Sequence, residues 1–184
     1  MSRARSFTLI LICALVVLPN DSEGAQNKSE KWYTYWGLGG ADPTYPSEVG
    51  SLLDLMGALP GVDRTRMSMD LLGFYMPISG KMLAGVVVNA TADRMDYGEQ
   101  DWMQVNLYTY AVSTQYYTRL VGQGVFGRLD IDLAAANISY DIEGDTEDET
   151  SDSGIGMLVG IGYAYPILSG TRIAFNLNLS LIHI

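Results

Sequence analysis

The sequence predicts an all-β fold, an antiparallel up-and-down barrel, on three observations. Strand-like segments follow one another from about residue 30, they alternate apolar and polar residues, and the breaks between them are alternately short and long. The short breaks are 77–80, 119–124 and 166–170, and the long breaks are 41–64, 93–101 and 141–153. Tight turns at one end and long loops at the other are typical of a transmembrane β-barrel of the bacterial outer membrane.

Seven strands are expected from the alternation of residues. The clearest is Thr171–Ile184, in which Ile173 and Phe175 share one face while Arg172 and Asn176 share the other. Alternation over about ten residues suits a tilted strand that crosses hydrocarbon. The remaining six segments, in chain order, are Trp32–Gly40, Arg66–Met76, Met82–Ala92, Met103–Tyr117, Val125–Tyr140 and Gly154–Tyr165.

The first 25 residues are expected to be a secretory signal peptide. Arg3 and Arg5 form a basic start, and the apolar run Phe7–Leu18 is too short to span a bilayer as a helix. The only cysteine of the chain, Cys13, lies in this run, so no disulfide is expected in residues 26–184. These residues are expected to form one barrel domain.

The first long break contains a stretch with helical spacing. Leu52, Leu53, Met56 and Leu59 recur at the spacing of one helix face, within residues 46–59. We therefore expect a short helix in this loop. It is expected to pack within the loop, with two alternatives left open, namely a position over the barrel mouth or on lipid headgroups.

Three short segments resemble small outer-membrane β-barrel proteins of the eight-stranded, OmpA/OmpX-like type. They are Tyr35–Gly39, Leu71–Pro77 and Gly160–Tyr163, and the resemblance extends over about residues 31–184. It implies eight antiparallel strands, a packed polar interior and insertion by the barrel-assembly machinery. Because only seven strands are visible and the chain ends at Ile184 without a terminal aromatic residue, the last strand is expected to be missing.

Charged residues on the polar faces of the expected strands predict ion pairs in the lumen. The interior of an eight-stranded barrel is just wide enough for side chains to fill, and buried charges need partners. We expect a structural charge network, and a gated ion path or a binding pocket is the alternative. The six residues are Arg66, Asp70, Arg128, Asp130, Asp132 and Arg172.

Aromatic residues gather beside the tight turns and at the start of the first strand. Amphipathic rings settle at the depth of lipid headgroups, so this clustering predicts an aromatic girdle at one membrane interface. The residues are Trp32, Tyr33, Tyr35, Trp36, Phe74, Tyr75, Tyr116, Tyr117, Tyr163 and Tyr165.

An acidic run occupies the last long break. Its spacing does not match a calcium-binding loop, so we expect a solvated loop tip. A weak divalent-cation site, or a cation-bridged contact with lipopolysaccharide, is the alternative. The acidic residues are Asp141, Glu143, Asp145, Glu147, Asp148, Glu149 and Asp152.

The expected function is that of an outer-membrane β-barrel protein of a Gram-negative cell envelope, with a structural, adhesive or surface-interaction role. Its expected partners are outer-membrane lipids, lipopolysaccharide, the barrel-assembly machinery and an extracellular ligand. The formal net charge of −10 argues against nucleic-acid binding. We expect a monomer without cofactor, metal or enzymatic activity.

Two other functions remain open. The first is a narrow, porin-like solute or ion pore. The second is a lipid A-modifying enzyme that uses His183, the only histidine, with a serine from a neighbouring strand.

Overall fold

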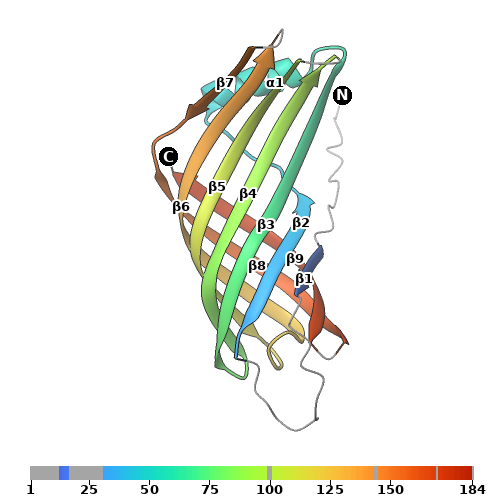
Figure 1. Cartoon of the computed structure of the whole chain (residues 1–184), viewed down its shortest axis with the longest axis vertical. Helices are drawn as coiled ribbons and strands as arrows, with labels where there is room; N and C mark the ends of the chain where they lie inside the picture. The colour runs from blue at the N-terminus through green and yellow to red at the C-terminus, as the bar shows by residue number, and fades with distance from the viewer. Residues whose placement is uncertain (1–12, 17–30, 99–100, 143–144, 169, 184) are drawn as a thin grey trace, which may run out of the picture.

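A computed structural model describes residues 13–16, 31–98, 101–142, 145–168 and 170–183, with the backbone alone for 13–16. Nine strands and one helix make up the fold within these ranges (Figure 1). The strands are β1 (Cys13–Val16), β2 (Tyr33–Gly40), β3 (Val62–Ser79), β4 (Met82–Tyr97), β5 (Asp101–Tyr117), β6 (Gly124–Ile142), β7 (Asp145–Thr150), β8 (Gly154–Leu168) and β9 (Thr171–His183). The helix is α1 (Ser47–Gly57).

All the strands belong to one antiparallel sheet. Its order is β5-β4-β3-β2-β1-β9-β8-β6-β7, and β5 also pairs with β6. The sheet curls into a half-barrel whose lateral edges, β2 and β9, are bridged over a short stretch by β1 (Figure 1). The predicted all-β, antiparallel fold is confirmed, and each of the seven expected segments is a strand.

The sequence prediction overestimated the length of the loops. β4 runs to Tyr97 and β5 begins at Asp101, so the expected long break 93–101 is a short connection between strands. The break 141–153 contains β7, which pairs with β6. Where the outer side of a strand suits water, its polar residues give that part of the sequence the composition of a loop. The backbone nevertheless continues its hydrogen-bonded pairing with the neighbouring strand. The signal-peptide prediction lies mostly outside the described residues, and Cys13–Val16 within it forms β1.

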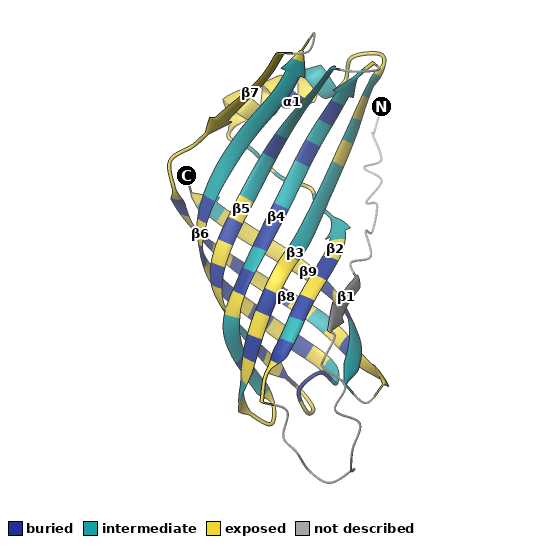
Figure 2. Cartoon of the chain, in the orientation of Figure 1, coloured by how far each residue is buried: buried dark blue, intermediate teal, exposed yellow. Residues whose placement is uncertain are grey.

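Two ends of the barrel can be distinguished. The turn end holds the tight connections β3–β4, β5–β6 and β8–β9, and the loop end holds α1 and β7 (Figure 1). In the half next to the turn end, inward residues are buried and outward residues are exposed, which gives the banded strands of Figure 2. The outward residues of this half are mostly apolar, among them Leu72, Phe74, Met76, Val86, Tyr110, Val112, Leu129, Ile131, Ile155, Val159, Ile161, Leu177 and Leu179.

The polarity of the two faces inverts in the half next to the loop end. On β5 the inward residues there are Met103 and Val105, whereas the outward residues are Gln104 and Asn106. Nearer the turn end of the same strand, Ser113 faces inward and Val112 and Tyr110 face outward. Because apolar side chains avoid water, the outer surface of the loop-end half suits water and that of the turn-end half suits an apolar surrounding.

Helix α1 fills the loop end of the interior. Its Leu53 is 1% exposed and packs with Met95 of β4 and Val105 of β5. The expected helix is therefore present, and it covers the inner wall at the barrel mouth. Leu52 and Leu59, expected on the same face, are exposed. α1, the one helix among the described residues, is 11 residues long and does not qualify as a membrane-spanning helix.

Candidate functional site

A guanidinium group lies at the centre of the turn-end half of the interior. Arg128 of β6 is 2% exposed, and its Nη2 lies 2.6 Å from Oδ2 of Asp130. Its Nη1 lies 3.1 Å from Oδ1 of Asp70 on β3, and its Nη2 also donates to Oδ1 of Asn89 at 3.2 Å. The ring of Tyr35 lies beneath the guanidinium, with its centroid 5.6 Å from Cζ. Arg128 thus joins β3, β4 and β6 through charge-assisted hydrogen bonds.

Neutral polar side chains continue this network across the interior. Asn89 donates to the hydroxyl of Thr109 at 3.2 Å, and the hydroxyls of Tyr75 and Ser113 lie 2.9 Å apart. On the opposite wall, Asn176 of β9 donates to the hydroxyl of Tyr35 at 3.1 Å. These contacts satisfy most of the polar groups around Arg128, as burial requires.

Asp132 stands apart from the network, although it follows Asp130 on the same face of β6. The residue is 3% exposed, and neither carboxylate oxygen has a hydrogen-bond partner among the described residues. The carboxylate lies over Gly156 of β8, where an added Cβ would come within 1.9 Å of Oδ1. Glycine at this position therefore makes the room that Asp132 occupies.

Of the six predicted lumen charges, the structure brings together Asp70, Arg128 and Asp130. Arg172 lies closer to the turn end, with its Cζ 5.5 Å from the centroid of the Tyr33 ring. The sixth residue, Arg66, belongs to a different cluster at the loop end. The predicted network is thus divided among separate sites, because strands of 13 to 19 residues spread one face over a long distance.

The prediction of an aromatic girdle on the outer surface is wrong for four of the ten residues. Neighbouring residues of a strand point to opposite faces, so each pair of adjacent aromatic residues divides between the two surfaces, whereas Tyr163 and Tyr165, two residues apart, share the outer face. Trp32, Trp36, Phe74, Tyr116, Tyr163 and Tyr165 are exposed on the outside. Tyr33, Tyr35, Tyr75 and Tyr117 are buried inside and belong to one apolar cluster.

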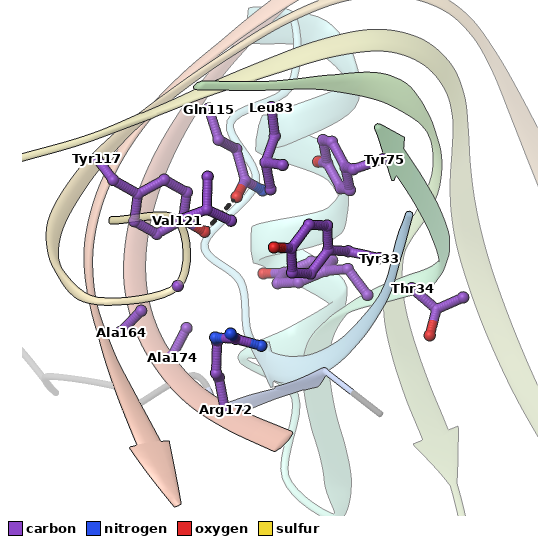
Figure 3. Close-up of a pocket in the computed structure, with 12 residues that line it drawn as sticks. Tyr33, Thr34, Tyr75, Leu83, Gln115, Tyr117, Val121, Ala164, Arg172 and Ala174 are labelled. Carbon is purple, nitrogen blue, oxygen red and sulfur yellow. Dashed lines mark hydrogen bonds between the residues drawn. The ribbon is translucent and has the colours of Figure 1, made fainter. Parts of the chain in front are cut away.

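The inward aromatic residues close the turn end. The rings of Tyr117 and Phe126 stack with centroids 5.1 Å apart, and those of Tyr35 and Tyr75 meet edge to face at 6.3 Å. Figure 3 shows a pocket among these rings, with the guanidinium of Arg172 directed into it. Val121, from the β5–β6 connection, lines the pocket as well.

A second group of charges ties α1 to the wall at the loop end. Arg64 makes a bidentate pair with Asp93, at 2.8 Å from Nε to Oδ1 and 2.6 Å from Nη2 to Oδ2, and also contacts Asp54 of α1 at 2.9 Å. Tyr45 donates to Asp93 at 3.0 Å. Burial, with the nearby charge of Asp93, raises the pKa of the Tyr45 hydroxyl. Arg66 pairs with Asp42 at 2.8 Å, so this cluster fixes both the helix and the segment that leads to it.

The central residue of this cluster was missed by the sequence analysis. Asp93 was assigned to a loop, yet it lies on β4 and its side chain is fully buried. A signal was available, because Asp93 continues the odd-numbered face that includes Leu83 and Val87. A nearly continuous apolar run in β4 concealed that alternation.

The acidic run is a β-hairpin arm and not an irregular tip. Asp145–Thr150 forms β7, and Tyr140 of β6 donates a hydrogen bond to Glu147. Of the predicted residues, Asp141 lies in β6 and Asp152 follows β7, while Glu143 lies outside the described residues. Every residue of β7 is exposed, as expected of a solvated segment. In the described part of the chain, no three acidic, histidine or cysteine side chains are placed to hold a metal ion.

The histidine does not lie beside its nearest serine. His183 and Ser180 are both on β9, three residues apart, and therefore point to opposite faces of the sheet. His183 pairs in register with Ile155 of β8, which carries no nucleophile. The geometry thus brings no serine and histidine together in this strand pair.

Comparisons with known proteins give no relative from which a function can be transferred. No protein-family model, curated protein or solved structure matches the chain. The interior itself is filled at three levels, by aromatic rings at the turn end, by the Arg128 network in the middle and by α1 at the loop end. Such an arrangement can support a rigid wall and position the loop end.

Proposed function

We propose that the chain is an outer-membrane β-barrel protein with a structural, adhesive or surface-interaction role. The observation that carries the proposal is the band of exposed apolar side chains around the turn-end half. On β8 this band runs from Ile155 to Tyr165, and on β9 the exposed apolar side chains run from Phe175 to Leu181. About nine to eleven residues is the length that a tilted strand needs to cross the hydrocarbon core.

The inversion of polarity supports this function over that of a barrel surrounded by water. A water-surrounded barrel keeps its apolar residues inside along the whole length of each strand. Here Val112 and Ile131 face outward at more than 60% exposure, while Ser113 and Asp130 are buried beside them. Only lipid, or another apolar surface of similar extent, makes that arrangement favourable.

A membrane around the turn-end half would also account for the polar composition of the loop end. Above the apolar band, Gln104 and Asn106 face outward, and β7 carries acidic residues into the surroundings. α1 and its charge cluster hold this end in a fixed shape. A rigid, polar loop end on a filled barrel suits contact with an extracellular partner. The filled interior gives no support to the alternative of a pore.

Tryptophan fluorescence in lipid vesicles tests the proposal. Trp36 lies in the exposed band, whereas Trp102 lies at the loop end, where the guanidinium of Arg94 is 4.6 Å from its ring centroid. In single-tryptophan variants reconstituted into vesicles with brominated acyl chains, we expect strong quenching of Trp36 and little quenching of Trp102.

The two tryptophans act as matched controls for each other, because both are on the outer surface of the sheet. Equal quenching of both, or recovery of the chain in the aqueous fraction after lysis without detergent, would contradict the proposal.

A further inference from the structure

Three methionine side chains gather at the loop end of the interior, between α1 and the wall formed by β4 and β5 (Figure 1). Met95 of β4 and Met103 of β5 are register partners, and both face inward. Side chains directly opposite each other on neighbouring strands have Cβ atoms about 5 Å apart, so these two thioethers lie within reach of each other. Met56 of α1 packs against the same cluster from the helix side. The three thioethers thus come from three different elements.

The sulfur of Met95 lies beside the end of α1. Its Sδ is 3.9 Å from the position that a Cβ on Gly57 would occupy, and Gly57 directly follows Met56 in the helix. Tyr97 donates a hydrogen bond to this Sδ at 3.6 Å. A thioether sulfur is a weak acceptor with two lone pairs, so this bond orients the sulfur and leaves one lone pair for a ligand.

Burial of the three methionines decreases from the wall toward the helix and the barrel mouth. Met95 is completely buried, whereas Met56 and Met103 are half-buried. The two half-buried side chains therefore connect the surface of the loop end with the enclosed sulfur. A small ion that reaches Met56 or Met103 needs only a change of side-chain rotamer to contact Met95, since methionine has three rotatable side-chain bonds.

The charges around the cluster do not repel a monovalent cation. Arg64 of β3, the register partner of Met95, pairs with both Asp93 and Asp54. Arg66 adds a second positive charge, and it pairs with Asp42. Two guanidinium groups thus face three carboxylates, and the local charge is slightly negative.

The atoms that face the cluster favour a soft metal ion over a hard one. Ca²⁺ and Mg²⁺ require several oxygen ligands, and Leu53 and Val105, which pack with Met95, have none in their side chains. Neutral thioether sulfur is a soft ligand and selects Cu(I) among the common biological metals.

We propose that Met56, Met95 and Met103 form a binding site for Cu(I). The three neutral sulfurs coordinate the ion, and its binding joins α1 to β4 and β5. The site goes beyond the proposed function, because it lies inside the wall and does not depend on what surrounds the outer surface.

Titration with Ag(I), a redox-stable ion with the same preference for sulfur, tests the proposal. The probe is added to the full chain carrying Cys13→Ser, so that no thiol competes, with the methionine methyl groups labelled for nuclear magnetic resonance. We expect saturation at one equivalent, with the methyl signals of Met56, Met95 and Met103 shifting together. The signals of Met76 and Met157, which are exposed on the outer surface, should not shift.

Leucine variants separate binding from packing, because leucine keeps the apolar volume of methionine and lacks its sulfur. We expect Met56→Leu and Met103→Leu each to weaken Ag(I) binding at least tenfold, and Met157→Leu on β8 to leave it unchanged. Both of the first two residues are half-buried, so these variants should fold, and urea unfolding without the metal verifies this.

The possible results divide cleanly. Folded protein without saturable Ag(I) binding, or equal affinity in the Met56→Leu, Met103→Leu and Met157→Leu variants, overturns the proposal and shows that the three methionines serve packing alone. Recovery of the chain in the aqueous phase overturns the proposed function and leaves this site untouched.

Discussion

At the scale of single residues, the interior shows how differently two neighbouring carboxylates can be placed. Asp130 and Asp132 share one face of β6, and both are almost completely buried. Asp130 forms an ion pair with Arg128, whereas Asp132 lies over a glycine without a hydrogen-bond partner among the described residues. A buried ion pair loses stability when one member is removed, because the other charge is left in a medium of low dielectric constant.

Substitution of Arg128, the ion-pair partner of Asp130, and substitution of Asp132 should therefore have unequal effects on the free energy of unfolding. Arg128→Met removes the guanidinium that pairs with Asp70 and Asp130, and we expect it to cost about 3–5 kcal/mol. Asp132→Asn keeps the shape of the side chain and removes a buried charge, so we expect no loss of stability. Urea unfolding in detergent micelles, followed by fluorescence, measures both. Equal destabilisation by the two substitutions would contradict the roles assigned to these residues.

At the scale of secondary-structure elements, α1 has a buried side and an exposed side. Leu53 packs against β4 and β5, while its neighbour Leu52 is 55% exposed. The charge cluster of Arg64, Asp93 and Asp54 adds a second attachment. The helix is thus part of the barrel interior, and its attachment depends on a few identifiable contacts.

The leucine pair offers a matched test of this attachment. Leu53→Ala leaves a cavity between α1 and the wall, and we expect a loss of about 2–5 kcal/mol, or release of the helix. Leu52→Ala should change stability by less than about 0.5 kcal/mol. Limited proteolysis within residues 41–61 reports release of the helix. Faster cleavage of the Leu52→Ala variant than of the Leu53→Ala variant would show that the helix is oriented otherwise.

The same elements show what could be predicted from sequence. Period-two alternation located seven strands, and helical spacing located α1, because each pattern reflects which side of one element is buried. The ion pairs of Arg66 with Asp42 and of Arg64 with Asp93 were not predictable, since they join distant elements, although the alternation along β4 indicates that Asp93 faces inward. The alternation of faces predicts which aromatic residues point inward and which point outward. Grouping neighbouring aromatic residues into one girdle ignored that alternation.

At the scale of the whole molecule, the barrel is filled along its axis. Aromatic rings, the Arg128 network and α1 occupy successive levels between the turn end and the loop end. We therefore expect no continuous water path for ions along this interior.

Planar-bilayer recordings test this consequence. We expect no steady conductance steps from the reconstituted chain. Deletion of residues 47–57 should leave the bilayer equally silent, because Tyr33, Tyr117 and Phe126 still close the turn end. Reproducible ohmic steps from the intact chain would instead favour the pore.

The change of polarity along the outer wall has one further consequence. If the barrel moved along its axis toward the cell interior, Gln104 and Arg94 would enter hydrocarbon, and if it moved outward, Leu129 and Val159 would be wetted. Both displacements are costly, so in the membrane setting proposed for this chain we expect a single preferred immersion depth. At that depth the acidic arm would stand at a constant height above the bilayer surface, which would set how closely a binding partner must approach.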